Sequence, residues 1–348
     1  CYAQCWITRP VLTADFDYFL PKELIAQTPV EPRDQARLLV MDKKRGTLSH
    51  RLFKNILDYL SPKDVVVINN TKVLAARLLG LRRDTGGKVE VFALRNINGS
   101  DWEVQVKASG KIQTGEIIDF GLAGSAQYVK KLPNGLSIVT LSSERVFQEH
   151  GLMPLPPYIK KELKQPNRYQ TVYAKHLGSA AAPTAGLHFT RELLVALKNL
   201  RITIAEVTLH VGVDTFRPVY EDNPINHEIH KEYWYLSDLA ADAINTAKLR
   251  GGRVVCVGTT TVRLLEHAAS VSGGLPLASG SGMADLYILP GFSFKITDAM
   301  ITNFHLPCST LLMLVSAFSD RDHIMAAYQE AINKKYRFYS FGDAMFIH

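Results

Sequence analysis

The chain has 348 residues, a length that suggests two domains at roughly 150 residues each. Hydrophobic residues make up 47% and charged residues 21%, which excludes wholesale disorder, a collagen-like repeat and a disulfide scaffold. Lysine and arginine number 40 against 33 aspartate and glutamate, and the resulting net charge of +7 permits a polyanionic partner.

The cysteines and the apolar runs indicate the compartment. Cys1 and Cys5 stand at the start of the chain and Cys256 and Cys308 lie far apart, which is not a secretory disulfide framework. No apolar run approaches the ~18 residues that a membrane span needs, and no signal-peptide pattern is present. We therefore expect a cytoplasmic protein that does not contact a membrane, with residues 1–12 as an extension outside the fold.

The first half of the chain predicts two helices followed by many strands. Apolar residues recur at helical spacing over residues 21–27 and 50–60, and the second run stops at Ser61 and Pro62. A β-branched run at 65–68 opens a region of alternating, closely spaced strands that extends to about residue 141. Such strands without helices predict a small antiparallel β-barrel.

The second half predicts α/β alternation. It begins after a proline-rich connection at 153–158, with helices at 190–200, 238–250, 261–269, 309–318 and 323–335, and strands at 202–209, 253–257 and 286–289. Residues 270–282 are rich in Ser and Gly and predict a loop. The predicted fold class is therefore an α/β layered main domain (13–62 and 153–348) into which a smaller antiparallel β-barrel domain (63–152) is inserted.

A threonine-rich turn follows the predicted strand at 253–257. Gly258 precedes Thr259, Thr260 and Thr261, which open a helix that carries Arg263. Free N–H groups at a helix start, added hydroxyl donors and a guanidinium group together favour a carboxylate or phosphate. The alternative is that one threonine caps the helix and the others have no special role.

Histidines near strand ends are candidates for proton transfer. His188 follows a loop of small residues, and His210 closes the predicted strand at 202–209. A single histidine is nevertheless more often structural than catalytic. His305 precedes a break at Pro307, which suggests a structural turn.

A metal site is a further alternative that the spacing disfavours. His227, Glu228 and His230 could join His210 around an ion, but the two neighbouring histidines lie three residues apart rather than four. We therefore expect no metal.

A basic, tyrosine-rich stretch follows the proline-rich connection. It is interleaved with Tyr158 and Tyr173, and its candidate RNA-binding residues are Lys160, Lys161, Lys164, Arg168, Tyr169 and Lys175. Such a stretch can follow an RNA backbone and stack bases, whereas the alternative is an ordinary solvated basic face.

Several longer stretches are typical of one family. They are residues 15–18 (DFDY), 69–73 (NNTKV), 87–90 (GKVE), 153–158 (MPLPPY), 169–173 (YQTVY), 182–189 (APTAGLHF), 208–212 (TLHVG), 258–260 (GTT), 290–292 (PGF), 302–307 (TNFHLP) and 341–345 (FGDAM). Through these stretches the chain resembles the S-adenosylmethionine:tRNA ribosyltransferase-isomerases of queuosine biosynthesis over nearly its whole length.

The resemblance implies both a fold and a reaction. The fold is an α/β domain with an inserted barrel, and the substrate is a tRNA that carries 7-aminomethyl-7-deazaguanine at the wobble position. The ribosyl part of S-adenosylmethionine moves onto this base and is isomerised, which gives epoxyqueuosine in tRNA and releases adenine and methionine. We expect a monomer with no metal and no permanently bound cofactor.

The family reaction suggests roles for the candidate residues. We expect the threonine turn and Arg263 to hold the methionine carboxylate of S-adenosylmethionine. His188 and His210 are the candidate catalytic residues, with Glu206 or Glu228 as the next candidates. Two rival functions remain, a non-catalytic RNA-binding protein and an enzyme of phosphosugars or nucleotides that uses the threonine turn for a phosphate.

Overall fold

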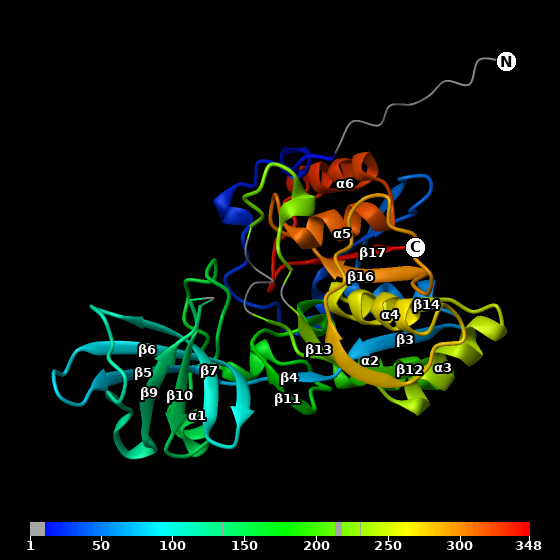
Figure 1. Ribbon diagram of the computed structural model, residues 1–348. Helices are drawn as coiled ribbons and strands as arrows, with labels where there is room; N and C mark the ends of the chain where they lie inside the picture. Colours follow the sequence, from blue (N-terminus) through cyan, green and yellow to red (C-terminus); the bar gives the residue numbers. More distant parts are fainter. Residues whose placement is uncertain (1–10, 134, 213–217, 230) are drawn as a thin grey trace.

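The computed structural model describes residues 11–133, 135–212, 218–229 and 231–348 (Figure 1). A large mixed sheet with helices on both faces forms one part, and a closed β-barrel stands beside it. This arrangement confirms the predicted fold class of an α/β domain with an inserted barrel.

The large sheet has nine strands, of which the middle four are parallel. In spatial order they are β15 (Gly280–Ala284), β13 (Glu232–Leu236), β12 (Thr203–Leu209), β3 (Val65–Asn69), β14 (Val254–Val257), β16 (Ala299–Asn303), β17 (Ala344–Ile347), β1 (Arg37–Met41) and β2 (Leu48–Leu52). All residues of β3 and β14 are buried, because both faces of the sheet are covered.

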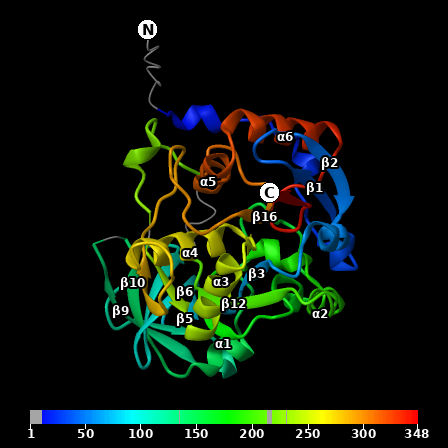
Figure 2. The same cartoon turned by 90° about the vertical axis from the view of Figure 1, so that its right-hand side faces the viewer.

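Two hydrophobic cores lie on the two faces of this sheet. Val65 and Val67 belong to one core and Val66 and Ile68 to the other, as the alternation of a strand requires. The first core packs α3 (Asp238–Leu249), α4 (Thr259–Val271), α5 (Thr310–Phe318) and α6 (Arg321–Asn333). The second packs α2 (Arg191–Asn199) and the 3-10 helix η4 (Phe53–Tyr59), and Figure 2 shows α2 and α3 on opposite sides of the strands.

The barrel closes through six antiparallel strands and encloses a core of its own. In spatial order they are β10 (Ser137–Leu141), β7 (Asp101–Ala108), β6 (Lys88–Asn98), β5 (Arg77–Arg82), β8 (Ile117–Asp119) and β9 (Ser125–Lys131), and α1 (Arg145–Glu149) packs against this core. A two-stranded parallel ribbon, β4 (Thr71–Val73) with β11 (His176–Ser179), lies between the barrel and the large sheet (Figure 1). The remaining described elements are the 3-10 helices η1 (Thr13–Phe16), η2 (Lys22–Leu24), η3 (Arg33–Gln35), η5 (Gly121–Ala123), η6 (Pro166–Tyr169), η7 (Thr184–His188) and η9 (Pro224–Asn226).

Several predicted boundaries are wrong. The insert does not begin at residue 63, because β3 lies at the centre of the large sheet. The run at 50–60 is the end of β2 followed by η4, and the run at 21–27 contains only η2. The strand predicted at 286–289 is irregular, and β15 begins within the predicted loop and extends two residues past its end.

The start of the chain lies mostly outside the described residues. Residues 1–10 of the predicted extension are not described, whereas Val11 packs against the first core of the large sheet. Of the helices in the described part of the chain, none has both the length and the apolarity to cross a membrane.

Candidate active site

Polar residues gather where the four parallel strands end. β3 ends at Asn69 and β16 at Asn303, while His210 follows β12 and Gly258 follows β14. Because the strands are parallel, these ends meet at one edge of the sheet, which is where α/β folds bind ligands. This edge is therefore the candidate active site.

Asn69 connects three of the elements at this edge. It is fully buried, and its Oδ1 accepts hydrogen bonds from the backbone N–H groups of Leu209 and Thr71, both at 3.1 Å. Its Nδ2 donates to the Leu209 carbonyl at 3.0 Å and to the Thr260 hydroxyl at 3.3 Å. The buried amide thus fixes the start of α4 relative to the ends of β3 and β12.

The threonine turn lines a pocket that we name the turn pocket. Thr259 and Thr260 form one wall, and residues at the end of β16 and in η7 form others. Tyr158, Phe304 and Tyr339 add aromatic surface to the pocket. Thr261 is fully buried and donates its hydroxyl to the Val257 carbonyl at 2.8 Å, so the prediction that it contacts a ligand is wrong.

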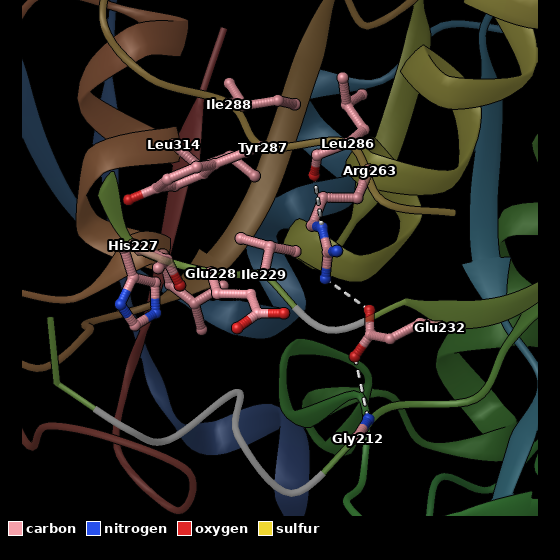
Figure 3. Close-up of a pocket in the computed structure, with 12 residues that line it drawn as sticks. Gly212, His227, Glu228, Ile229, Glu232, Arg263, Leu286, Tyr287, Ile288 and Leu314 are labelled. Carbon is pink, nitrogen blue, oxygen red and sulfur yellow. Dashed lines mark hydrogen bonds and ion pairs between the residues drawn. The ribbon is translucent and has the colours of Figure 1, made fainter. Parts of the chain in front are cut away.

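Arg263 lies in a second pocket, the arginine pocket (Figure 3). Its Nη1 lies 2.5 Å from Oε2 of the buried Glu232, whose Oε1 accepts a hydrogen bond from Gly212 N at 2.9 Å. Its Nε donates to the Leu286 carbonyl, while its buried Nη2 has no hydrogen-bond partner among the residues that the structure describes. The residues predicted to form one carboxylate site therefore lie in two pockets, the threonines in the turn pocket and Arg263 in the arginine pocket. The two pockets are neighbours, because Leu311 lines both.

His227 and Glu228 also line the arginine pocket. The His227 Nδ1 lies 2.8 Å from Glu221 Oε2, while His230 is outside the described residues. Among the residues that the structure describes, no group of three or more His, Cys, Asp or Glu side chains is placed to hold a metal ion.

His188 is buried behind the turn pocket. Only 4% of its surface is exposed, its ring packs on Phe53, and its Nε2 accepts a hydrogen bond from Asn303 Nδ2 at 3.2 Å. Burial, reinforced by the Arg337 and Arg33 guanidinium groups, lowers the pKa of His188 to about 3. Because Asn303 lines the turn pocket and His188 does not, the geometry favours a positioning role for His188.

His210, the residue that follows β12, is half-buried. Its Nδ1 lies 2.8 Å from the Thr71 hydroxyl, and its ring stacks on Tyr233 with 5.6 Å between centroids. Burial, followed by the charge of His176, lowers the pKa of His210 below 6.5. The imidazole is therefore neutral near pH 7 and able to accept a proton, although its ring lines neither described pocket.

With this geometry established, comparisons with known proteins identify the family. A family model described as "Queuosine biosynthesis protein" matches residues 13–347. The chain belongs to this family. Proteins named S-adenosylmethionine:tRNA ribosyltransferase-isomerase from Staphylococcus aureus strains Newman and JH9 are 51% identical over 338 residues, which is 96% of this chain and 98% of theirs. The crystal structure of S-adenosylmethionine tRNA ribosyltransferase from Thermotoga maritima is 36% identical, with a TM-score of 0.55 over 96% of this chain and 100% of that chain.

In the basic stretch, some of the candidate RNA-binding residues have no ion-pair partner in the described ranges, and others are held in ion pairs. Lys160, Lys161 and Lys164 are exposed, and no ion pair joins them to any residue in the described ranges. Arg168 instead binds Glu31 at 2.7 Å, and the Lys175 Nζ binds Glu206 at 2.6 Å.

The tyrosines of this stretch face inward. Tyr169 is completely buried against Phe341, and Tyr173 is also buried. The prediction that Tyr169 stacks on RNA is therefore wrong, because its ring has no exposed face. The interleaving of basic and tyrosine residues did not reveal which side chains of residues 158–175 pack on the core, because the segment is irregular.

The sequence prediction missed the amides that organise the site. Asn69 and Asn303 hold the threonine turn and the η7 segment in place, and Asn303 Oδ1 accepts a hydrogen bond from Thr184 Oγ1 at 3.1 Å. A signal was available, since both residues end buried apolar strands. Polar residues at the carboxyl ends of buried strands are sensible candidates for a site.

Proposed function

We propose that this chain is an S-adenosylmethionine:tRNA ribosyltransferase-isomerase. It transfers the ribosyl group of S-adenosylmethionine onto the aminomethyl group of 7-aminomethyl-7-deazaguanine at the wobble position of tRNA. The transferred group is isomerised to an epoxycyclopentanediol, which gives epoxyqueuosine, and adenine and methionine leave. The observation that carries the proposal is the 51% identity with proteins of this name over 96% of the chain.

The two neighbouring pockets support a binding mode for S-adenosylmethionine. We place the methionine end in the arginine pocket, where Arg263 Nη2, which has no partner within the described ranges, is a donor for the α-carboxylate. Glu228, which lines the same pocket, supplies negative charge for the α-ammonium group. The adenosine end then reaches toward Thr259 and Thr260 and the aromatic walls of the turn pocket.

The proposed chemistry needs one base and one acid. The sulfonium charge acidifies the neighbouring carbon, and a base that removes its proton starts the transfer, after which adenine leaves with help from an acid. His210 is the proposed base, because its lowered pKa keeps it neutral and the Thr71 hydroxyl orients its ring. These steps use no metal, and the monomeric state and cytoplasmic location predicted from the sequence stay predictions.

The exposed lysines are proposed to contact the tRNA backbone. Replacing Lys160, Lys161 and Lys164 together with alanine is expected to weaken tRNA binding and to reduce the slope of log Kd against log salt by about 2 to 3, since each phosphate contact contributes about 0.7 to 0.9. Fluorescence anisotropy with labelled tRNA across a salt series measures both quantities.

A matched triple variant serves as the control for the lysines. Lys22, Lys44 and Lys198 are also exposed but lie on other elements, so their replacement by alanine changes the net charge equally. A salt slope that stays the same in the first triple variant, or that falls equally in both, removes the basic stretch as the phosphate contact.

One incubation separates the proposed function from its rivals. The protein is mixed with S-adenosylmethionine and with tRNA that carries or lacks the 7-aminomethyl-7-deazaguanine base. Release of adenine with the modified tRNA supports the transferase. Binding of tRNA without turnover supports a non-catalytic RNA-binding protein, and indifference to both substrates supports an enzyme of phosphosugars or nucleotides.

A further inference from the structure

The outer face of the sheet next to His210 carries exposed aromatic side chains that the proposed catalytic steps do not use. Along β13 the residues Glu232, Trp234 and Leu236 are buried, whereas Tyr233 is 42% and Tyr235 is 44% exposed. The register places Tyr233 opposite Met283 of β15, which is 43% exposed. The exposed fractions of these side chains leave part of each available to a ligand.

These side chains form a row that ends at His210. The backbone N–H of His210 donates to the Tyr233 carbonyl at 2.9 Å, and the two rings are stacked with an interplanar angle of 23°. Met283 of β15, Tyr233 of β13 and His210 at the end of β12 therefore lie side by side, and Tyr235 is two residues further along β13. We name Met283, Tyr233 and Tyr235 the tyrosine platform, and His210 adjoins it.

The far side of His210 is held in place by the β4–β11 ribbon. Thr71 of β4 contacts its Nδ1, and a methyl group on Gly178 of β11 would stand 2.8 Å from its Nε2. The position of the platform relative to the proposed base is thus fixed by the fold rather than by flexible loops.

The charges around the platform are those that a nucleic acid prefers. Lys231 directly precedes β13, two residues before Tyr233, and its ion pair with Asp285 is long, at 3.5 Å, and exposed. Lys72 is exposed on β4, and the basic stretch of residues 160–175 runs directly into β11. Two phenol rings and one thioether are too small a patch for a stable protein–protein interface. Aromatic rings flanked by lysines are instead the surface to which a single-stranded RNA binds, with its bases on the rings and its phosphates near the lysines.

We infer that the tyrosine platform stacks unpaired bases of the tRNA anticodon loop, with Tyr233 under the base nearest to His210. This inference rests on the proposed function for the identity of the RNA. Aromatic side chains are the usual partners of bases splayed out from RNA loops, and stacking here brings the wobble base to the proposed base His210. The tyrosine platform takes over the stacking role that the sequence had assigned to the buried Tyr169.

The test is equilibrium binding of an anticodon stem-loop RNA, measured without S-adenosylmethionine. Tyr233→Ala and Tyr235→Ala are each expected to raise Kd about 5- to 150-fold, the range that corresponds to one stacked base. Tyr233→Phe and Tyr235→Phe keep the ring and are expected to bind like the wild type. Since stacking carries no charge, the salt slope stays unchanged, in contrast to the lysine variants.

The control is Tyr220→Ala, because Tyr220 is 74% exposed and lies near Cys308 rather than on the edge strands. Normal Kd values in both folded alanine variants, or an equal rise in Tyr220→Ala, overturn the inference. Failure of the proposed function is distinguishable, because the stem-loop assay needs no turnover. If the wild type releases no adenine yet the platform variants lose RNA affinity, the transferase proposal fails and the platform stands.

Discussion

Replacing His210 with alanine is expected to lower the single-turnover rate of adenine release by about 10² to 10⁴ while both substrates still bind, because that is the usual contribution of a general base. The imidazole is partly exposed, hydrogen-bonded to Thr71 and stacked on Tyr233 of the tyrosine platform, which places it beside the base that the platform is proposed to bind. Rapid-quench measurement at saturating substrates gives the rate directly.

The pH dependence follows from the direction of the pKa shift. Burial lowers the pKa of His210, so the neutral form persists below pH 6.5. The rate in the wild type should therefore stay constant down to below pH 6.5 and fall as the pH drops through the lowered pKa. This acid limb should be absent from the residual activity of His210→Ala.

Two further variants separate catalysis from positioning. His176→Ala removes an exposed histidine of the neighbouring strand β11 and is the matched control for His210. His188→Ala is expected to act through Asn303, so His188→Gln, which keeps an acceptor for the Asn303 amide, should restore the rate. Near-normal rates in both folded His188→Ala and His210→Ala would remove the two histidines and make Glu206 or Glu228 the next candidate.

Replacing Arg263 is expected to raise the KM for S-adenosylmethionine about 10- to 150-fold, because a lost charged hydrogen bond costs about 1.5 to 3 kcal/mol. The tRNA affinity should not change, since the arginine pocket is proposed to hold the methionine end. Initial rates of adenine release against S-adenosylmethionine concentration, together with stem-loop binding, give both values.

The choice of variant matters because Arg263 has a structural partner. Arg263→Ala leaves the buried Glu232 without its guanidinium group, and breaking such a pair costs about 3 to 5 kcal/mol of stability. The double variant Arg263→Gln with Glu232→Gln removes both charges and keeps an acceptor for Gly212 N. A normal KM in the folded double variant, with weakened tRNA binding, would mean that the pocket takes a phosphate instead.

The elements that sequence patterns predicted well are those stabilised by local periodicity. Helices α2 to α6 begin at a capping residue or carry an apolar face, and the closely spaced strands expected from residue 65 to about 141 predicted the barrel, although the first of them, β3, belongs to the large sheet. Strands β1 and β17 were not predicted. Their pairing with each other joins residues some three hundred positions apart, as Leu39 with Met345, which no local pattern reveals, although β1 also pairs with β2 and β17 with β16. Residues 50–60 look helical, yet β2 pairs with β1 and only a 3-10 helix follows it.

The position of a site residue was predictable where it follows from one continuous segment, and it was not predictable where it follows from packing between distant segments. The threonine turn follows directly from a buried strand and a helix start, and Thr259 and Thr260 line the turn pocket, while their contact with S-adenosylmethionine stays a prediction. Thr259 and Arg263 lie on the same face of α4 but one helical turn apart. Thr259 therefore lines the turn pocket beside the end of β16, whereas Arg263 reaches Glu232 of β13 in the arginine pocket. The burial of Tyr169 depends on Phe341, which is far away in the sequence.

The measurement that tests the central claim most directly is adenine release from S-adenosylmethionine with tRNA that carries 7-aminomethyl-7-deazaguanine. The same tRNA with an unmodified guanine at the wobble position is the control. We expect adenine and methionine to form together, in equal amounts with epoxyqueuosine in the recovered tRNA, and no release with the control. Absence of adenine with the modified tRNA, from folded protein that binds both substrates, would contradict the proposed function.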